Sequence, residues 1–512
     1  MGEGVMGILS WAHPRTLARS LAVLDLGSGT LRLVVYAYEP GRGYHRVDEL
    51  REAVALGEGL AKGQLTPEAL ERGVKALRAF ADFLRAAGAE EVRTLATSAI
   101  RDSANGGLIL EEARRLGLRP ELLAGEEEAR LGVLAVANGL PLRDALVVDQ
   151  GGGSAQISLM QGRRFLWGKA LPLGALRLTE GFLTQDPPSR AEVRALARKV
   201  EDYLEALPLP RGLPLVGLGG NLRAVARIHQ KRHAYPFDFV HGYFLPKEGV
   251  EELYEALMPL SGKARMEAAE LSPDRARTLP ASLVFLRSLL KVTRASGLWI
   301  SGLGIREGVL FSRLLPEPHL LEDPARFAVE NLFWRYPFAL EHRDHVRALA
   351  SSLFSGLAPL HGYGEEEERL LQAACLLHDI GMHIGYPDHH KHGAYLVLSE
   401  PLLGMEHREQ ALLALMVRYH RRGDPSLGPF RPLARRGDGK RLARLAVILR
   451  LAEMLDRTRA QRVREVRVEV GPQVRLRLLA SAEPWVERVE AEKQAPLFQK
   501  VYGRPLEVVW EG

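Results

Sequence analysis

Two segments of the chain share one pattern, in which an apolar strand ends in aspartate and continues into a turn of glycine and hydroxyl residues. The first covers residues 21–30 (LAVLDLGSGT), and the second covers residues 145–154 (ALVVDQGGGS). Glycine lets the backbone turn tightly and approach a ligand closely, so that successive N–H groups can point at phosphate oxygens. The aspartate that ends each strand can hold a cation beside them. The repetition predicts a duplicated fold that grips one phosphate chain from two sides.

The rest of the first half fits the same architecture. Glycine-rich turns also follow apolar runs at residues 215–221 (LVGLGGN) and 301–308 (SGLGIREG), and each turn leads into a helical segment. Strands that alternate with helices in this way indicate an α/β fold, in which phosphates bind where strands end and helices begin. Residues 316–324 (PEPHLLEDP) have the composition of a linker. Beyond them we expect helices, then a strand–strand–helix–strand tail over residues 463–510.

Two further segments carry polar groups suited to phosphate chemistry. Residues 96–101 (ATSAIR) combine small hydroxyl residues with Arg101, whose guanidinium can make two hydrogen bonds to a phosphate. An ordinary strand end followed by a helix cap explains this segment equally well. Residues 122–130 (LLAGEEEAR) open a helix with three glutamates. Acids in a first helical turn often only complement the helix dipole, but one of these could be the base that activates a water.

Composition limits the class of protein. A length of 512 residues suggests about three domains, and 46% apolar with 26% charged residues is typical of a soluble globular protein. The net charge of +6 favours an anionic partner such as nucleic acid, nucleotide or a phosphate polymer. The single cysteine, Cys375, lies in an apolar run and fits a reducing cytoplasm. No stretch is long and apolar enough to predict a membrane span. Residues 1–20 lack a signal-peptide core, so we expect a disordered tail there, with Met6 as an alternative start.

Histidines gather in the helical second half. Residues 376–381 (LLHDIG) place His378 beside Asp379, and the other histidines of this region are His342, His389, His390, His392 and His420. One histidine on an apolar helix is usually a core residue. A spaced set beside a carboxylate instead suggests a divalent metal, because imidazole and carboxylate are suitable ligands for iron, zinc and manganese.

Taken in order, these motifs resemble those of the exopolyphosphatase and guanosine pentaphosphate phosphohydrolase (Ppx/GppA) family. The resemblance rests on DLGSGTLR from residue 25, ATSAIR from 96, GEEEAR from 125, DQGGGS from 149, GLGG from 217 and GIREG from 304. It implies two duplicated actin/sugar-kinase/Hsp70-like (ribonuclease H-like) lobes, at residues 1–136 and 137–315. The second half is similar to the long family members, which implies a helical HD-type domain at residues 325–461 and a small α+β cap at residues 462–512.

The resemblance also implies roles for single residues. Glu128 is the expected catalytic base, and Asp25 and Asp149 are expected to hold Mg²⁺. The expected phosphate-binding residues are Gly27, Ser28, Thr30, Arg32, Ser98, Arg101, Gly151, Gly152, Gly153, Ser154, Gly219 and Gly220. Three positions depart from the family pattern, which usually has glutamate at Gln156, asparagine at Gly29 and threonine at Asn221. Glutamine cannot supply negative charge to a metal.

The HD-type resemblance implies a metal set in the second half. His342, His378, Asp379 and Glu453 correspond to the usual ligands of one ion. His392 and His420 fall where binuclear HD phosphohydrolases place further ligands. We therefore expect one or two iron, zinc or manganese ions in this domain.

Several functions follow from these expectations. The first is an exopolyphosphatase, in which a Glu128-activated water attacks the terminal phosphate of inorganic polyphosphate with the help of Mg²⁺. A 5'-phosphohydrolase that converts pppGpp to ppGpp would use the same chemistry. Two alternatives of other classes are a sugar-kinase-like protein that uses ATP, and a phosphate-polymer sensor whose HD-type domain performs hydrolysis. We expect polyphosphate or guanosine polyphosphate as partner and a homodimer, with neither a membrane nor a specific nucleic acid.

Overall fold

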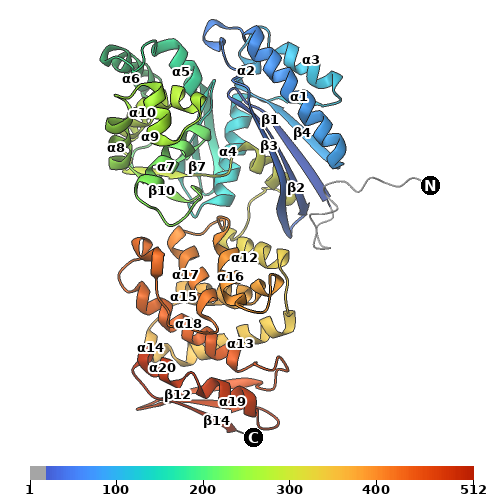
Figure 1. The fold of residues 1–512 in the computed structure, drawn as a ribbon, viewed down its shortest axis with the longest axis vertical. Helices are drawn as coiled ribbons and strands as arrows, with labels where there is room; N and C mark the ends of the chain where they lie inside the picture. Colours follow the sequence, from blue (N-terminus) through green and yellow to red (C-terminus); the bar gives the residue numbers. More distant parts are fainter. Residues whose placement is uncertain (1–18, 512) are drawn as a thin grey trace, which may run out of the picture. The chain divides into compact units, whose positions relative to one another are not determined.

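The computed structural model describes residues 19–511, and the chain in it divides into two compact units, Met1–Pro324 and Ala325–Gly512 (Figure 1). The boundary falls at the end of the proline-rich segment expected to be a linker. The tail expected at residues 1–20 and the alternative start at Met6 lie outside the described residues, except for residues 19 and 20. Within residues 19–511, no helix is long and apolar enough to cross a lipid bilayer.

The first half of the first unit is built on a five-stranded sheet of order β3-β2-β1-β4-β5. Its strands are β1 (Arg19–Leu26), β2 (Thr30–Glu39), β3 (Gly43–Ala53), β4 (Glu91–Ala96) and β5 (Pro120–Leu122). Helix α1 (Pro67–Ala87) begins as the sequence predicts, because the Thr66 side chain accepts a hydrogen bond from the Ala69 N–H (3.2 Å) and Pro67 occupies the first turn. Strand β1 is antiparallel to β2 and parallel to β4, so it forms the centre of the sheet.

The second half repeats this arrangement with one strand more. Its six-stranded sheet has the order β10-β11-β9-β6-β7-β8. The strands are β6 (Ala145–Gln150), β7 (Ala155–Gln161), β8 (Arg164–Leu171), β9 (Leu215–Leu218), β10 (Tyr243–Pro246) and β11 (Gly297–Ile300). Strand β6 is antiparallel to β7 and parallel to β9, as β1 is to β2 and β4. The strands that carry the two glycine-rich loops are therefore topological equivalents, as the repeated motif predicts.

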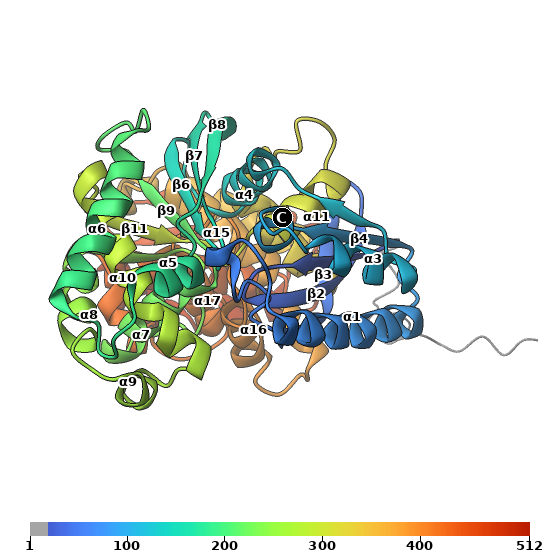
Figure 2. The same ribbon diagram turned by 90° about the horizontal axis from the view of Figure 1, so that it is seen from above.

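Two helices lie between the sheets (Figure 2). Helix α4 (Gly125–Gly139) packs on β7 and β8, helix α11 (Ile305–Leu314) packs on β1 and β2, and the two helices pack on each other. The other helices of the unit are α2 (Ser98–Arg101), α3 (Gly107–Arg115), α5 (Ala175–Phe182), α6 (Arg190–Glu205), α7 (Gly220–Arg232), α8 (Lys247–Leu257), α9 (Gly262–Ala269) and α10 (Pro273–Thr293). This packing fixes both sheets around the helix that begins with the three glutamates.

The second unit is helical and ends in a small sheet. Its helices are α12 (Pro324–Arg335), α13 (Leu340–Gly356), α14 (Ala358–His361), α15 (Glu365–Leu377), α16 (His389–Leu398), α17 (His407–Tyr419) and α18 (Asp438–Met454). The tail contains β12 (Glu465–Val470), β13 (Val474–Leu479), α19 (Trp485–Glu492), α20 (Ala495–Tyr502) and β14 (Leu506–Glu511). The expected strand–strand–helix–strand order is present, with two short helices in place of one.

Candidate functional site

The two glycine-rich loops meet at the carboxyl ends of β1 and β6. A Cβ atom added to Gly152 would lie 3.0 Å from Ser28 Cβ, and one added to Gly153 would lie 2.8 Å from both Ser28 Oγ and Ser98 Oγ. The two serine hydroxyls are themselves 3.1 Å apart. Only glycine allows this approach, so loops about 120 residues apart in the sequence (Ser28 and Gly152) form one surface.

The start of helix α5 holds the second loop in shape. The Ala175 N–H donates to the carbonyl oxygen of Gly151 (2.9 Å), and the Leu176 N–H donates to that of Gly152 (3.0 Å). A Cβ atom on Gly174 would lie only 2.3 Å from the carbonyl carbon of Gly153. The backbone at the start of α5 therefore holds the carbonyls of this loop in place.

Two half-buried carboxylates, Asp25 and Asp149, end the central strands and line the cavity beside these loops. Burial raises the pKa of Asp25 to about 6; the Arg306 guanidinium opposes this shift, and the Asp149 carboxylate adds to it. Burial also raises the pKa of Asp149. Two neighbouring carboxylates with little access to solvent are suitable ligands for Mg²⁺, which prefers oxygen donors and would offset their charge. The residues present therefore fit this ion.

Glu128 is the acid of α4 that reaches the cavity. It is buried, its Oε1 forms an ion pair with Arg101, and its Oε2 accepts a hydrogen bond from Gln156 Nε2 (2.8 Å). Burial raises the pKa of Glu128 to about 7, although Arg101 opposes the shift. By contrast, Glu126 is exposed and Glu127 forms an ion pair with Arg130 (2.7 Å). Of the three adjacent acids, only Glu128 therefore lines the cavity.

Gln156 holds the Glu128 carboxylate in position. Its Nε2 atom donates to Glu128 Oε2 and also to Ser154 Oγ (2.9 Å), and the side chain is buried. A glutamine at this position supplies a hydrogen-bond donor, which a carboxylate cannot do without a proton. Glutamine at position 156, where the family usually has glutamate, therefore gives Glu128 a neutral hydrogen-bond partner.

Six arginines line the same cavity: Arg32, Arg51, Arg223, Arg275, Arg277 and Arg306. Burial lowers the pKa of Arg32 to about 10, and the charges of Arg306 and Arg223 contribute. Arg306 Nη1 is buried without a hydrogen-bond partner among the described residues. Crowded guanidinium groups of this kind favour an anionic ligand in the cavity.

Sequence analysis had anticipated only Arg32 of these six. A usable signal was present, since Arg223 and Arg306 each lie in the first turns of a helix that follows a glycine-rich turn. Most of the other expected phosphate-binding residues line the cavity. Arg101 instead binds Glu128 and the carbonyl oxygen of Leu123 (2.8 Å), and Gly153 packs against Ser28 and Ser98.

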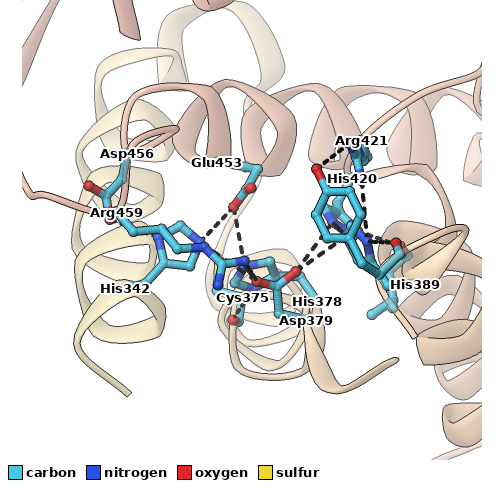
Figure 3. A network of polar contacts seen from close by, with 12 residues as sticks. His342, Cys375, His378, Asp379, His389, His420, Arg421, Glu453, Asp456 and Arg459 are labelled. Atoms are coloured by element: carbon cyan, nitrogen blue, oxygen red, sulfur yellow. Dashed lines mark hydrogen bonds and ion pairs between the residues drawn. The ribbon is translucent and has the colours of Figure 1, made fainter. Parts of the chain in front are cut away.

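A second polar cluster lies within the helical unit (Figure 3). His342 Nε2 and His378 Nε2 lie 2.9 and 3.3 Å from Glu453 Oε2. On the other side of Asp379, His389 Nε2 lies 3.3 Å from Asp379 Oδ1 and 3.2 Å from His420 Nε2. Ligands about 2.1 Å from one ion stand roughly 3 Å apart when they meet at right angles. Two groups of side chains are therefore spaced closely enough to bind one metal ion each, and both groups include Asp379.

The histidine rings of this cluster are oriented by their second nitrogen. The Nδ1 atoms of His378, His389 and His420 donate to the backbone carbonyls three residues earlier, at 2.7, 3.0 and 2.7 Å. Their Nε2 atoms then face the cluster, an arrangement common among metal-binding histidines. His378 Nε2 and Asp379 Oδ1 are buried and have no hydrogen-bond partner among the described residues. The donor set therefore fits a transition metal.

The histidines on the two sides of the cluster differ in protonation. Burial lowers the pKa of His420 to about 3 and also lowers that of His389, so both rings are neutral and have a free lone pair near pH 7. Burial opposes protonation of His342 as well, but its hydrogen bonds to Asp456 and Glu453 outweigh this effect and raise its pKa to about 9. A metal on that side would replace the proton on His342.

The expectation for His392 is corrected by the structure. His389, not His392, stands with Asp379 and His420. A Cβ atom on Gly381 would lie 2.0 Å from the carbonyl oxygen of His389 and 2.4 Å from the Gly393 nitrogen. Positions 389 and 393 therefore share the helix face that packs on the His378–Asp379 turn. The spacing of His389 and Gly393 was the signal that sequence analysis did not use.

Comparison with known proteins gives consistent matches over both units. Residues 34–317 match the Ppx/GppA phosphatase family, and residues 326–494 match Ppx/GppA phosphatase domain III. The chain is 27% identical over 455 residues to a guanosine-5'-triphosphate,3'-diphosphate pyrophosphatase of Aeromonas hydrophila, covering 86% of this chain and 88% of that protein. It is 31% identical over 290 residues to exopolyphosphatase 2 of Mycobacterium tuberculosis, covering 54% and 91%.

Two solved structures each match somewhat more than half of the chain. The crystal structure of the Aquifex aeolicus Ppx/GppA family member has a TM-score of 0.50 at 29% identity and covers 57% of this chain and 97% of its own. An exopolyphosphatase of Cytophaga hutchinsonii has a TM-score of 0.53 at 22% identity, covers 58% and 98%, and supports the fold alone.

Proposed function

The chain belongs to the Ppx/GppA phosphatase family, and we propose that it is an exopolyphosphatase that releases the terminal phosphate of inorganic polyphosphate. The observation that carries this proposal is the lining of the cavity, where two glycine-rich loops, a buried glutamate and six arginines converge. No aromatic side chain among the described residues lines it. A repeating polyanion needs many cationic contacts and no surface for stacking a base, which favours polyphosphate over a nucleotide.

The reaction is an in-line displacement. A water held by Glu128 Oε2 attacks the terminal phosphorus and gives its proton to that carboxylate, while the bridging P–O bond breaks and its electron pair leaves with the shortened chain. The amides and hydroxyls around Ser28 and Ser154 receive the phosphoryl oxygens. Arg306 and Arg223 balance the charge of the departing polymer. Mg²⁺ held by Asp25 and Asp149 would supply positive charge at the phosphoryl oxygens.

The architecture supports finer assignments. We infer that the two halves of the first unit are actin-like lobes, because they share one strand order about two equivalent loops. We also infer that the helical part of the second unit is an HD-type domain, because adjacent His378 and Asp379 stand at the centre of its histidine cluster.

A guanosine pentaphosphatase activity is the second candidate at the same cavity. It is favoured by the Aeromonas hydrophila relative, which matches 86% of this chain. Phosphate release from polyphosphate, pppGpp and ATP, measured in parallel, decides among the candidates. We expect polyphosphate to have the highest kcat/KM. A preference for pppGpp would identify the second activity, and phosphate transfer from ATP to a sugar would identify a kinase.

For the second unit we propose a centre of one or two transition metal ions, held by His342, His378, Asp379 and Glu453 on one side and by Asp379, His389 and His420 on the other. Such a centre would bind phosphate and activate water, which would give the chain a second site of hydrolysis. Elemental analysis of gently purified protein tests the proposal. Protein that contains no transition metal, and whose Tm does not rise when iron, zinc or manganese is added, would exclude it, since a ligand of the folded state stabilises that state.

A further inference from the structure

The cluster of the second unit already holds a cation that belongs to the chain itself. Arg459 Nη2 lies 2.7 Å from Asp379 Oδ2, and Asp379 belongs to both groups of potential metal ligands. A guanidinium has hydrogen-bond donors and no available lone pair, so it neutralises the carboxylate but cannot bind a metal. A metal ion bound at Asp379 Oδ2 would place a second positive charge beside the guanidinium, and this repulsion favours release of Arg459.

The loop that carries Arg459 keeps it near the cluster after displacement. Arg459 has a φ of 58°, and its N–H donates to the carbonyl oxygen of Asp456 (2.8 Å). The carboxylate of Asp456 accepts from the Gln461 N–H (2.8 Å) and binds His342 Nδ1 (2.7 Å). The loop is thus tied to a residue of the cluster, and only the Arg459 side chain needs to move.

The released guanidinium would face solvent, and a second one lies on the opposite side of the cluster. The Arg459 side chain is 32% exposed and lies over the Phe338 ring, 5.1 Å from its centre. Arg421 approaches the His389 side of the cluster, with Nη1 3.3 Å from His389 Nδ1 and Nη2 2.9 Å from the Tyr386 hydroxyl (Figure 3). Two forked cations beside a metal centre suit the oxygens of a phosphate group.

We propose that Arg459 is an exchangeable counter-ion. It neutralises Asp379 in the metal-free protein, and metal binding releases it to bind a phosphate group of a phosphorylated ligand at the same centre. This inference rests on the metal centre proposed above. It assigns two opposite effects to Arg459. The side chain weakens metal binding because it competes for Asp379, and it strengthens phosphate binding once the metal is in place.

The test uses the full chain with Arg459→Ala and Arg459→Lys. Zinc affinity is measured by competition with a chromogenic chelator, with excess Mg²⁺ present so that the cavity of the first unit contributes equally to every sample. We expect Arg459→Ala to bind zinc roughly three- to thirtyfold more tightly than the unaltered chain, as expected for the loss of one competing ion pair. Arg459→Lys, which keeps the charge, should lie between the two.

Inorganic phosphate is then titrated calorimetrically into zinc-loaded and zinc-free samples. The phosphate binding that depends on zinc should weaken about tenfold or more in Arg459→Ala. Arg462→Ala is the matched control, since this nearby arginine donates to the carbonyl oxygen of Glu483 (3.1 Å) and should change neither measurement.

Each outcome has a separate meaning. If the unaltered chain binds no zinc, the proposed metal centre is refuted, and so is the proposed role of Arg459. If the chain binds zinc but Arg459→Ala binds it no more tightly, Arg459 does not compete with the metal. If zinc binding tightens while zinc-dependent phosphate binding is unchanged, the released side chain does not hold phosphate. Either of the last two results overturns the inference and leaves the centre in place.

Discussion

At the scale of single residues, the environment of Glu128 determines the chemistry of the cavity. Its carboxylate lies between a cation, Arg101, and a neutral amide, Gln156. Burial raises its pKa to about 7 and the cation limits that rise. A general base is most effective when its pKa lies near the working pH. In the proposed reaction, the Arg101 ion pair would therefore keep this buried acid available as a base near neutrality.

Replacing Glu128 with glutamine removes the base but keeps its size. We expect Glu128→Gln to lower kcat about 10²- to 10⁴-fold with little change in substrate binding. In the unaltered enzyme, kcat/KM should rise with pH up to about 7, because the carboxylate accepts a proton only after losing its own. Steady-state kinetics between about pH 5 and 9 measure both effects. Glu127→Gln is the control, and an equal loss there would contradict the assignment.

Gln156 should tune this pH profile. Its hydrogen bond favours the charged form of Glu128, so Gln156→Leu should raise the pKa of Glu128 further and move the acidic limb of the profile to higher pH. Activity at pH 7 should fall, with recovery at more alkaline pH. Gln161→Leu, at the exposed end of the same strand, provides a comparison. A uniform loss of activity at every pH would mean that Gln156 acts through structure alone.

At the scale of elements, the active cavity depends on close contact between glycines and neighbouring backbone. Helix α5 binds the carbonyls of the second loop, and Gly174 at its N-terminus lies against Gly153. The same principle operates in the second unit, where Gly381 and Gly393 let helix α16 approach the His378–Asp379 turn. In both places, the absence of a side chain sets the position of functional side chains nearby.

Two glycines of the α5 segment should therefore respond in opposite ways to alanine. Gly174→Ala would place a methyl group 2.3 Å from the Gly153 carbonyl carbon, which must move the loop, so we expect a large loss of kcat/KM and a lower Tm. Gly181→Ala, within the helix and with no neighbour inside 4 Å, should stabilise the protein by roughly 0.5–1 kcal/mol. Thermal unfolding and phosphate release distinguish them, and similar behaviour of both variants would contradict the packing argument.

At the scale of the whole molecule, positive charge is concentrated where the substrate binds. The chain carries a net charge of +6, and six arginines line one cavity. Burial, together with the neighbouring charges of Arg51, Arg32 and Arg223, lowers the pKa of Arg275 to about 10. Such a field attracts a polyanion and is screened by salt.

Activity on long polyphosphate should consequently fall more steeply with salt than activity on a short substrate, because a longer chain contacts more of these cations. Contacts beyond about 8 Å are screened at physiological ionic strength. Arg277→Ala, at the half-exposed rim of the cavity, should reduce the difference between chain lengths while leaving kcat on the short substrate unchanged. The measurement is kcat/KM from low to high salt for both substrates. An identical salt dependence for all chain lengths would exclude an extended binding track.

The sequence alone determined the features that depend on local chemistry. The loops at Asp25 and Asp149, the start of α1 at Thr66 and the alternation of strands with helices follow from apolar periodicity, glycine and capping residues, which act over a few positions. The same patterns located the acidic turn of α4 and the histidine-rich region. Only the tertiary structure decided which members of these groups meet. It showed that Glu128, already expected from the family resemblance, reaches the cavity while its neighbours do not, placed His389 where His392 was expected, and brought Arg223 and Arg306 to the cavity. Side-chain direction depends on how elements pack, and that packing is set by contacts between residues far apart in the chain.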